Sequence, residues 1–429
     1  MSSEPEVPQP SPGQRLRLAD ILGPGLITGA SDDDPSGIAT YSQAGAQFGY
    51  GLGWTLVATY PFMAAVQIIS ARIGRTTGQG IAGTLRQFYP RWLLLAIVLP
   101  LLVANTINIG ADLGAMADAT RLVTGGPSYA YELIFAAFCA VTQVVMNYSR
   151  YVAILRWLTL ALLAYVITLF MVHVLWRDAL LHVVAPRFSW SKDYLTTIVA
   201  VFGTTISPYL FFWQASEEAE DIHQIAGRIA LNGAPEQGLA ELKRIELDTM
   251  GGMAASNLVA LAIVLTTAAT LHVAGVMDIH TSAQAAEALR PLAGSQASLI
   301  FALGIIGTGL LAVPVLAGSA AYAVGEALHW PVGLARRPKQ AKAFYGTIVA
   351  ATGIGMMVNL TPIDPIKALY WTAVINGIVA VPIMAIMMLL SSRSDIMGPF
   401  IVNGPLRWLG WLATALMGAA VLAMAWTSF

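Results

Sequence analysis

The chain reads GPGLITGASDDDPSG over residues 23–37, and this stretch decides the fold. Apolar residues extend it on both sides, to the length of a membrane-spanning helix. Three consecutive aspartates, Asp32, Asp33 and Asp34, interrupt it and are followed by Pro35. An acidic residue at the bilayer centre costs roughly 2.5–3.5 kcal/mol, and a proline removes a backbone hydrogen-bond donor. The stretch therefore predicts an unwound segment facing a protein-lined cavity, where carboxylates and freed carbonyls can bind a cation.

The composition is that of a membrane protein. Of 429 residues, 56% are hydrophobic and 11% are charged, against about 25% charged in soluble domains, and the mean hydropathy is +0.66. The formal charge of −1 leaves no basic surface for nucleic acid. The single cysteine, Cys139, excludes a disulfide framework and a cysteine-based zinc site. We expect an all-α polytopic protein in a lipid bilayer, with no nucleic-acid partner.

Eleven apolar segments are long enough to span the hydrocarbon, and 17 of the 23 Lys and Arg side chains fall on one side of them. This bias predicts a cytoplasmic N-terminus, with a polar tail over residues 1–18, and an outer C-terminus in the cell membrane, the inner membrane in a bacterium. The predicted spans are 21–48, 51–73, 92–120, 130–147, 151–176, 194–216, 249–275, 297–328, 341–360, 366–390 and 405–427.

A second interruption lies in the sixth span, where residues 203–209 read GTTISPY. Paired broken helices, one opening each half of a chain, indicate a secondary transporter built from inverted repeats. We expect a first five-helix repeat over residues 19–176, a second over 177–390, and an added eleventh span over 391–429. Because each repeat has an odd number of spans, five, the two repeats are expected to be antiparallel.

Polar residues also follow one face of the third span. Asn105, Asn108 and Asp112 stand at positions i, i+3 and i+7 of a helix. An intramembrane aspartate on such a face indicates a proton relay or an ion ligand, with a hydrogen-bonded structural cluster as the alternative. The acidic run at 217–221, after the sixth span, favours a solvated helix end over a cation-attracting exit vestibule.

Three of these stretches resemble the NRAMP family of divalent-metal transporters. They are Asp34-Pro35-Ser36-Gly37, Ala111-Asp112-Leu113 and the proline break of the sixth span. The resemblance runs from Gly23 through the tenth span. It implies a LeuT-like fold of eleven helices, with a metal site between the unwound parts of spans 1 and 6 and Asp34 as its aspartate. The divalent cation would be the substrate, and no cofactor is expected.

The chain also departs from the family pattern, which is Asp-Pro-Gly-Asn in span 1 and Met-Pro-His in span 6. Gly37, Ser207 and Tyr209 stand at the asparagine, methionine and histidine positions, and Asn105 and Ala115 replace acidic residues of span 3. Loss of the soft thioether removes a filter against hard ions. The smaller side chains are expected to enlarge the cavity, and a tyrosine, which titrates near pH 10, cannot replace a histidine. The pattern resembles the NRAMP-related magnesium transporters, which carry Mg²⁺ and Mn²⁺ with little proton coupling.

We therefore predict a transporter, not an enzyme, that carries Mg²⁺ and/or Mn²⁺ by alternating access, with weak or absent proton coupling. Asp34 is the main ligand, and Asp33 is a second carboxylate or lies just outside the ligands. Asp112, with Asn105 and Asn108, is a remnant proton or salt-bridge site. The other residues predicted to surround the metal are Ser31, Gly37, Thr204, Thr205, Ser207 and Tyr209.

There are three alternative functions. The same fold could carry an organic cation paired with Asp34, with Trp213 or Tyr209 as aromatic walls. It could also be a sensor that transports nothing. An intramembrane aspartyl protease would need two carboxylates sharing a proton, and the Gly-x-Gly-Asp signature of that class is not found around Asp112. The oligomeric state is left open.

Overall fold

The computed structural model describes residues 24–145, 162–225, 227–360 and 364–428, and every regular element in these ranges is helical. The α-helices are α2 (Pro24–Asp32), α3 (Pro35–Phe48), α4 (Gly53–Thr77), α5 (Ile81–Phe88), α6 (Arg91–Thr124), α7 (Ser128–Val145), α9 (Leu163–Met171), α10 (Trp176–Val184), α11 (Lys192–Thr205), α12 (Pro208–Gln224), α13 (Gly238–Thr267), α14 (Ser282–Ala286), α15 (Arg290–Ala293), α16 (Ala297–Ala327), α17 (Lys342–Met357), α18 (Pro365–Ser391), α19 (Ser394–Met397) and α20 (Gly404–Trp426). A short 3₁₀ segment, Gly49–Leu52, joins α3 to α4, and a π-helical turn, Ala268–His272, extends α13.

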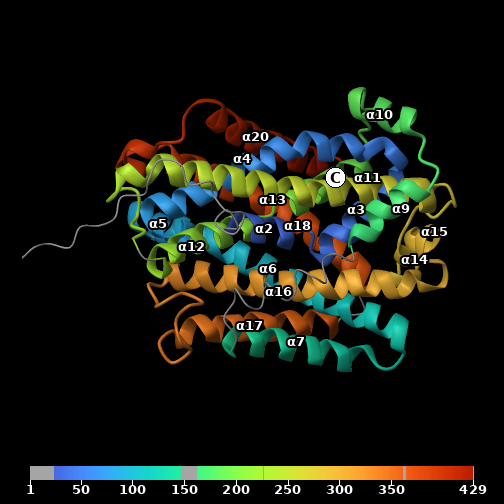
Figure 1. Cartoon of the computed structure of the whole chain (residues 1–429), viewed down its shortest axis with the longest axis horizontal. Helices are drawn as coiled ribbons and strands as arrows, with labels where there is room; N and C mark the ends of the chain where they lie inside the picture. Colours follow the sequence, from blue (N-terminus) through green and yellow to red (C-terminus); the bar gives the residue numbers. More distant parts are fainter. Residues whose placement is uncertain (1–23, 146–161, 226, 361–363, 429) are drawn as a thin grey trace, which may run out of the picture.

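The long helices run side by side along the longest axis of the molecule (Figure 1). In this view α7 and α17 form one edge and α4 and α20 the other, with the short helices α2 and α3 between them. Helix α2 packs on α13, α12 on α4, α11 on α18, and α6 on α16. The half-helices α2 and α3 therefore lie inside the bundle, among its longer helices.

Nine helical stretches of the described residues are long and apolar enough to cross a membrane, or ten if the pair α9 and α10, bent by 119°, is one span. One of the nine, Pro35–Thr77, has 43 residues. Such a helix would be about 65 Å long, twice the hydrocarbon thickness. The 3₁₀ segment at Gly49–Leu52 divides it into α3 and α4. The count of eleven stays a prediction, because much of the predicted fifth span lies on residues 146–161, outside the described ranges.

Both predicted interruptions are present. The first span breaks between α2 and α3 at Asp33 and Asp34, and the sixth breaks between α11 and α12 at Ile206 and Ser207. The polar stretch 217–248 is more helical than predicted, since α12 continues to Gln224 and α13 already begins at Gly238. Charged side chains on these two extensions bind one another, so the helices stay ordered beyond their apolar parts.

Each broken span packs closely against a neighbouring helix at a glycine. A Cβ atom added to Gly29 of α2 would overlap the backbone of Gly252 in α13, and one added to Gly203 of α11 would overlap the carbonyl of Ala373 in α18. Small residues permit such close helix approaches in membranes. Each broken span is thereby fixed by backbone contact within a few residues of its break.

Candidate metal site

Asp34 begins the second half of the first broken span. It is the N-cap of α3, and its Oδ1 accepts hydrogen bonds from the Gly37 amide at 2.7 Å and the Ser36 hydroxyl at 2.6 Å. Pro35 follows as the first helical residue, where its missing N–H is no loss. Asp34 is only 1% exposed. One carboxylate oxygen thus holds the start of the helix, while the other, Oδ2, points elsewhere.

At the second break, side-chain hydroxyls donate hydrogen bonds to carbonyls at the end of α11. Ser207 precedes α12, and its hydroxyl donates back to the carbonyls of Gly203 at 2.9 Å and Thr204 at 2.8 Å. The Thr205 hydroxyl donates to the Val201 carbonyl one turn earlier. The Ser207 oxygen keeps lone pairs for a ligand, whereas the Thr205 hydroxyl is directed along its own helix.

Tyr209 brings the two breaks together. Its hydroxyl donates to the Ser31 carbonyl at 2.9 Å and lies 3.5 Å from Asp34 Oδ2. A Cβ atom at Gly37 would lie 3.1 Å from the Thr204 hydroxyl oxygen. Two stretches about 175 positions apart therefore meet, with Tyr209 beside the Asp34 carboxylate.

The third span supplies one more contact. Asn108 of α6 donates its amide to Asp34 Oδ2 at 3.1 Å and to Asp112 Oδ2 at 3.4 Å. A single side chain thus connects the carboxylate at the break with the buried aspartate of the polar face. Asn105 is separate, because its amide binds the Leu316 carbonyl of α16.

Asp32 and Asp33 turn to a different helix. The Ser256 hydroxyl of α13 lies 2.6 Å from Asp32 Oδ2 and 3.2 Å from Asp33 Oδ1. Neither aspartate is bonded to the groups around Asp34 in any hydrogen bond of the described residues. The aspartate triplet marked this region in the sequence, but nothing in the sequence pointed to Ser256, more than 200 residues away.

The surroundings of Asp34 suit a cation that prefers oxygen. Within the described ranges no Lys or Arg forms an ion pair with Asp32, Asp33 or Asp34, and no three His, Cys, Asp or Glu side chains converge as a metal-holding group. Several buried oxygens of the three spans receive no hydrogen bond, among them Asp32 Oδ1, Asn108 Oδ1 and Asp112 Oδ1. Buried acceptors without a donor are costly, and a cation can satisfy them.

Two expectations fail, one about the size of Gly37 and one about Trp213 as an aromatic wall for an organic cation. Gly37 does not enlarge the cavity in this conformation, because the Thr204 hydroxyl and the Tyr41 ring lie 3.1 and 3.3 Å from where its Cβ would be. Trp213 does not wall the site either. It is buried against α16, where it meets Gly318 and the ring of Tyr322. The packing of neighbouring side chains decides both results.

Family models and known proteins identify the fold family of this arrangement. The model of the family described as natural resistance-associated macrophage protein-like, Nramp, matches residues 25–427. The chain belongs to the Nramp family. The match covers both broken spans and α6, so the residues around Asp34 lie within the family domain.

Two curated Nramp relatives carry the name divalent metal cation transporter MntH. The protein of Deinococcus radiodurans is 27% identical over 414 residues, covering 94% of this chain and 88% of the relative. That of Pectobacterium carotovorum is 25% identical over 405 residues, covering 92% and 90%. The crystal structure of the Eremococcus coleocola manganese transporter, in complex with an aromatic bis-isothiourea substituted compound, superposes with a TM-score of 0.73 at 15% identity, covering 97% and 88%. This likeness shows a shared fold.

One cavity of this Nramp chain leads toward the break from the side predicted to face outward. It has a volume of 330 Å³ and lies between α3, α11 and α18. Ala39 and Gln43 of α3 line it, about one and two turns after Pro35. The cavity therefore reaches the outer half of the first broken span.

Asn376 is a buried polar residue of α18. It is 1% exposed, and neither atom of its amide has a hydrogen-bond partner. The next residue, Gly377, packs against Val199 and Gly203 of α11, just before the second break. An interhelical hydrogen bond is therefore not what holds Asn376 in this conformation.

Proposed function

We propose that this Nramp protein carries a divalent metal cation, Mn²⁺ and/or Mg²⁺, across the membrane by alternating access. The names of its MntH relatives support a divalent cation as the substrate. The observation that carries the proposal is the Asp34 carboxylate, buried at the meeting point of two broken helices with no basic partner in the described ranges. A cation bound to this carboxylate would offset the cost of burying its charge.

Oxygen groups of the two breaks would complete the cation's shell. The candidates are the Ser31 carbonyl, the Thr204 hydroxyl and the Ser207 oxygen, with Tyr209 and Asn108 orienting the carboxylate. Oxygen ligands suit Mg²⁺ and Mn²⁺, and Mg²⁺ keeps part of its water. Asp33 would act from outside this shell, because its hydrogen bond is to Ser256.

Weak or absent proton coupling forms part of the proposal. Tyr209 occupies the position of the family histidine, and Asn105 hydrogen-bonds to a carbonyl of α16. Asp112 is the one acidic residue left of the predicted set on α6, and Asn108 joins it to Asp34. The two carboxylates thus communicate through an amide, which does not titrate in the physiological range.

The test is uptake into proteoliposomes of the full chain. Mn²⁺ influx is followed with a trapped fluorescent indicator, with Mg²⁺ outside as competitor and with and without a pH gradient. Asp34→Ala removes the carboxylate. Asp178→Ala is the matched control, because Asp178 is exposed on α10, far along the chain from either break.

The proposal predicts saturable Mn²⁺ influx that Mg²⁺ suppresses and that does not depend on the pH gradient. This influx should be lost in Asp34→Ala and kept in Asp178→Ala. Influx insensitive to Mg²⁺ would contradict the preference for hard ions. A strong dependence on the pH gradient would contradict the absence of coupling. No influx of either metal would refute metal transport and leave an organic cation or a sensor role.

A further inference from the structure

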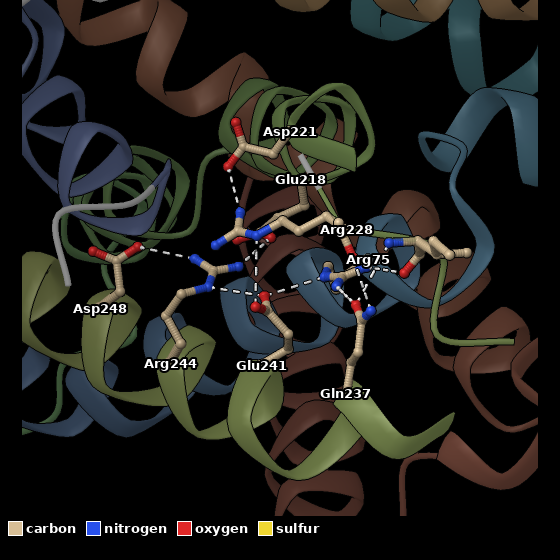
Figure 2. A network of polar contacts seen from close by, with 10 residues as sticks. Arg75, Glu218, Asp221, Arg228, Gln237, Glu241, Arg244 and Asp248 are labelled. Atoms are coloured by element: carbon tan, nitrogen blue, oxygen red, sulfur yellow. Dashed lines mark hydrogen bonds and ion pairs between the residues drawn. The ribbon is translucent and has the colours of Figure 1, made fainter. Parts of the chain in front are cut away.

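A network of charged side chains joins the helix ends on the side predicted to face inward (Figure 2). It connects α4, α12, α13 and the segment between α12 and α13. We call it the inner network; its residues are Arg75, Glu218, Asp221, Arg228, Gln237, Glu241, Arg244 and Asp248. Arg75 and Glu218 are fully buried, so their contacts are shielded from water and salt.

Glu241 is the centre of the inner network. Its carboxylate meets three guanidinium groups, at 3.2 Å from Arg75 Nε, 3.5 Å from Arg228 Nε and 3.1 Å from Arg244 Nε. Arg75 belongs to α4 and Arg244 to α13, whereas Arg228 follows α12 and also pairs with Asp221. One carboxylate thereby fixes the inner ends of three chain segments relative to each other.

Arg244 extends the inner network to both broken spans. Its Nη2 lies 2.5 Å from Glu218 Oε2 on α12, the inner half of the sixth span. Its Nη1 lies 4.0 Å from Asp248 Oδ2, one turn further along α13. Figure 2 shows Arg244 between these two carboxylates, with Glu241 on its third side.

Asp248 makes the contact with the first broken span. Its Oδ2 accepts a 2.8 Å hydrogen bond from the backbone N–H of Gly25, which is 223 positions away at the start of α2. The N–H groups of a first helical turn have no partner within their own helix. Asp248 therefore caps α2 from another helix, a role usually filled by the residue just before a helix.

The contact is tight. A Cβ atom at Gly25 would lie 2.8 Å from the Thr249 backbone nitrogen and 2.9 Å from Asp248 Oδ2. One turn later, Gly29 meets the backbone of Gly252. The inner half of the first span is thus packed against α13 at both Gly25 and Gly29, with Asp248 at the N-terminal end of α2.

We propose that Asp248 is a latch that holds α2 on α13 and keeps the inner side of Asp34 closed, with Arg244 joining the latch to α12. This inference rests on the alternating-access function proposed above. Asp34 comes two residues after the end of α2, so movement of α2 away from α13 uncovers Asp34 from the inner side. Opening requires the Gly25 hydrogen bond to break.

Arg244 makes the latch reversible. When Gly25 leaves, Asp248 Oδ2 keeps Arg244 Nη1 within 4.0 Å as an alternative partner. Loss of a hydrogen-bond donor destabilises a buried carboxylate. The Arg244 guanidinium beside Asp248 offsets part of this cost when α2 moves away, and α2 can return to the same place.

The experiment measures cysteine labelling on α2. Thr28→Cys in a Cys139→Ala background places one thiol on the buried inner half-helix, where the Thr28 hydroxyl donates to the Pro24 carbonyl of its own turn. A membrane-impermeant maleimide is added outside inside-out vesicles, whose outer surface is the face predicted to be cytoplasmic. Asp248→Ala removes the latch. Glu246→Ala is the matched control, because Glu246 lies on the same helix but pairs with Arg72 of α4.

We expect Asp248→Ala to raise the labelling rate roughly five- to tenfold, the effect of losing one helix cap. Asp248→Asn, which keeps an oxygen acceptor, should stay within about twofold of the parent. Should Asp248→Ala fail to fold, Gly25→Ala tests the same contact from α2, since its methyl group pushes against Asp248 and Thr249.

Equal labelling of Asp248→Ala and Glu246→Ala would overturn the latch, as would Gly25→Ala labelling at the parent rate. The ratio of the labelling rates of variant and parent can be measured without any transported ion. A parent protein that carries neither Mn²⁺ nor Mg²⁺ would refute the proposed function and leave the latch to be judged by the ratio alone.

Discussion

Asp34 has two roles in this structure, and the substitution Asp34→Asn separates them. Its Oδ1 caps α3 through Ser36 and Gly37, while its negative charge is proposed to bind the metal. Asparagine is as good an N-cap as aspartate and has the same shape. We expect the variant to fold normally and to lose high-affinity metal uptake.

The magnitudes follow from these contacts. Because the two cap hydrogen bonds remain possible, the free energy of unfolding should change by no more than about 1 kcal/mol. At an effective dielectric constant of 20, a carboxylate attracts a divalent cation 4 Å away by about 8 kcal/mol. Lost solvation offsets much of this attraction. If one third of it survives as binding energy, neutralising Asp34 weakens the apparent affinity by roughly 100-fold.

The two assays are thermal melting in detergent and the concentration dependence of Mn²⁺ influx in proteoliposomes. Asp178→Asn, on the exposed face of α10, controls for the loss of one negative charge. An Asp34→Asn protein that melts like the parent but takes up Mn²⁺ with an affinity within threefold of it would refute the ligand role. A large fall in melting temperature would show that the carboxylate is needed for folding instead.

Three further predictions concern the same region and the inner network. Gly37→Asn introduces the asparagine of the family pattern but pushes its side chain against Thr204. It should destabilise the protein by about 1–3 kcal/mol, measured as a lower melting temperature. An unchanged melting temperature would mean that the space beside Gly37 is open. Tyr209→Phe removes the hydrogen bond to Ser31 and should lower the free energy of unfolding by about 1 kcal/mol. Mn²⁺ influx should still be independent of a pH gradient. A change in how influx depends on that gradient would give the Tyr209 hydroxyl a role in proton coupling. Glu241→Ala leaves three guanidinium groups without their shared carboxylate. It should lower the free energy of unfolding by about 3 kcal/mol. A melting curve like that of the parent would show that those groups find other partners.

The breaks in the helices could be predicted from the sequence because their cause is local. Pro35 and Pro208 begin the second half-helices, as expected of residues that cannot donate inside a helix. The periodic polar face of the third span also placed Asn108 and Asp112 together, and the structure brings Asn108 to Asp34. Signals carried by neighbouring residues or by helical period were sufficient for these parts.

Contacts between distant segments could not be predicted in this way. The acidic run after the sixth span was expected to be a solvated helix end, and that expectation was wrong for Glu218, which is buried and paired with Arg244. The same holds for Ser256 beside Asp32 and for Asp248 beside Gly25. Each pair is joined only by helix packing, which hydropathy and charge order do not reveal. The antiparallel repeats, the orientation and the role of each ligand stay predictions.

The prolines that start α3 and α12 also affect the electrostatics of the backbone. Each helix carries a dipole that leaves partial negative charge at its C-terminal carbonyls and partial positive charge at its N-terminal N–H groups. At both breaks a C-terminal end, of α2 or α11, faces an N-terminal end whose first residue has no N–H. The carbonyl ends of α2 and α11 therefore add partial negative charge at the two breaks. A cation bound beside Asp34, as proposed, would be attracted by the main chain as well as by the carboxylate.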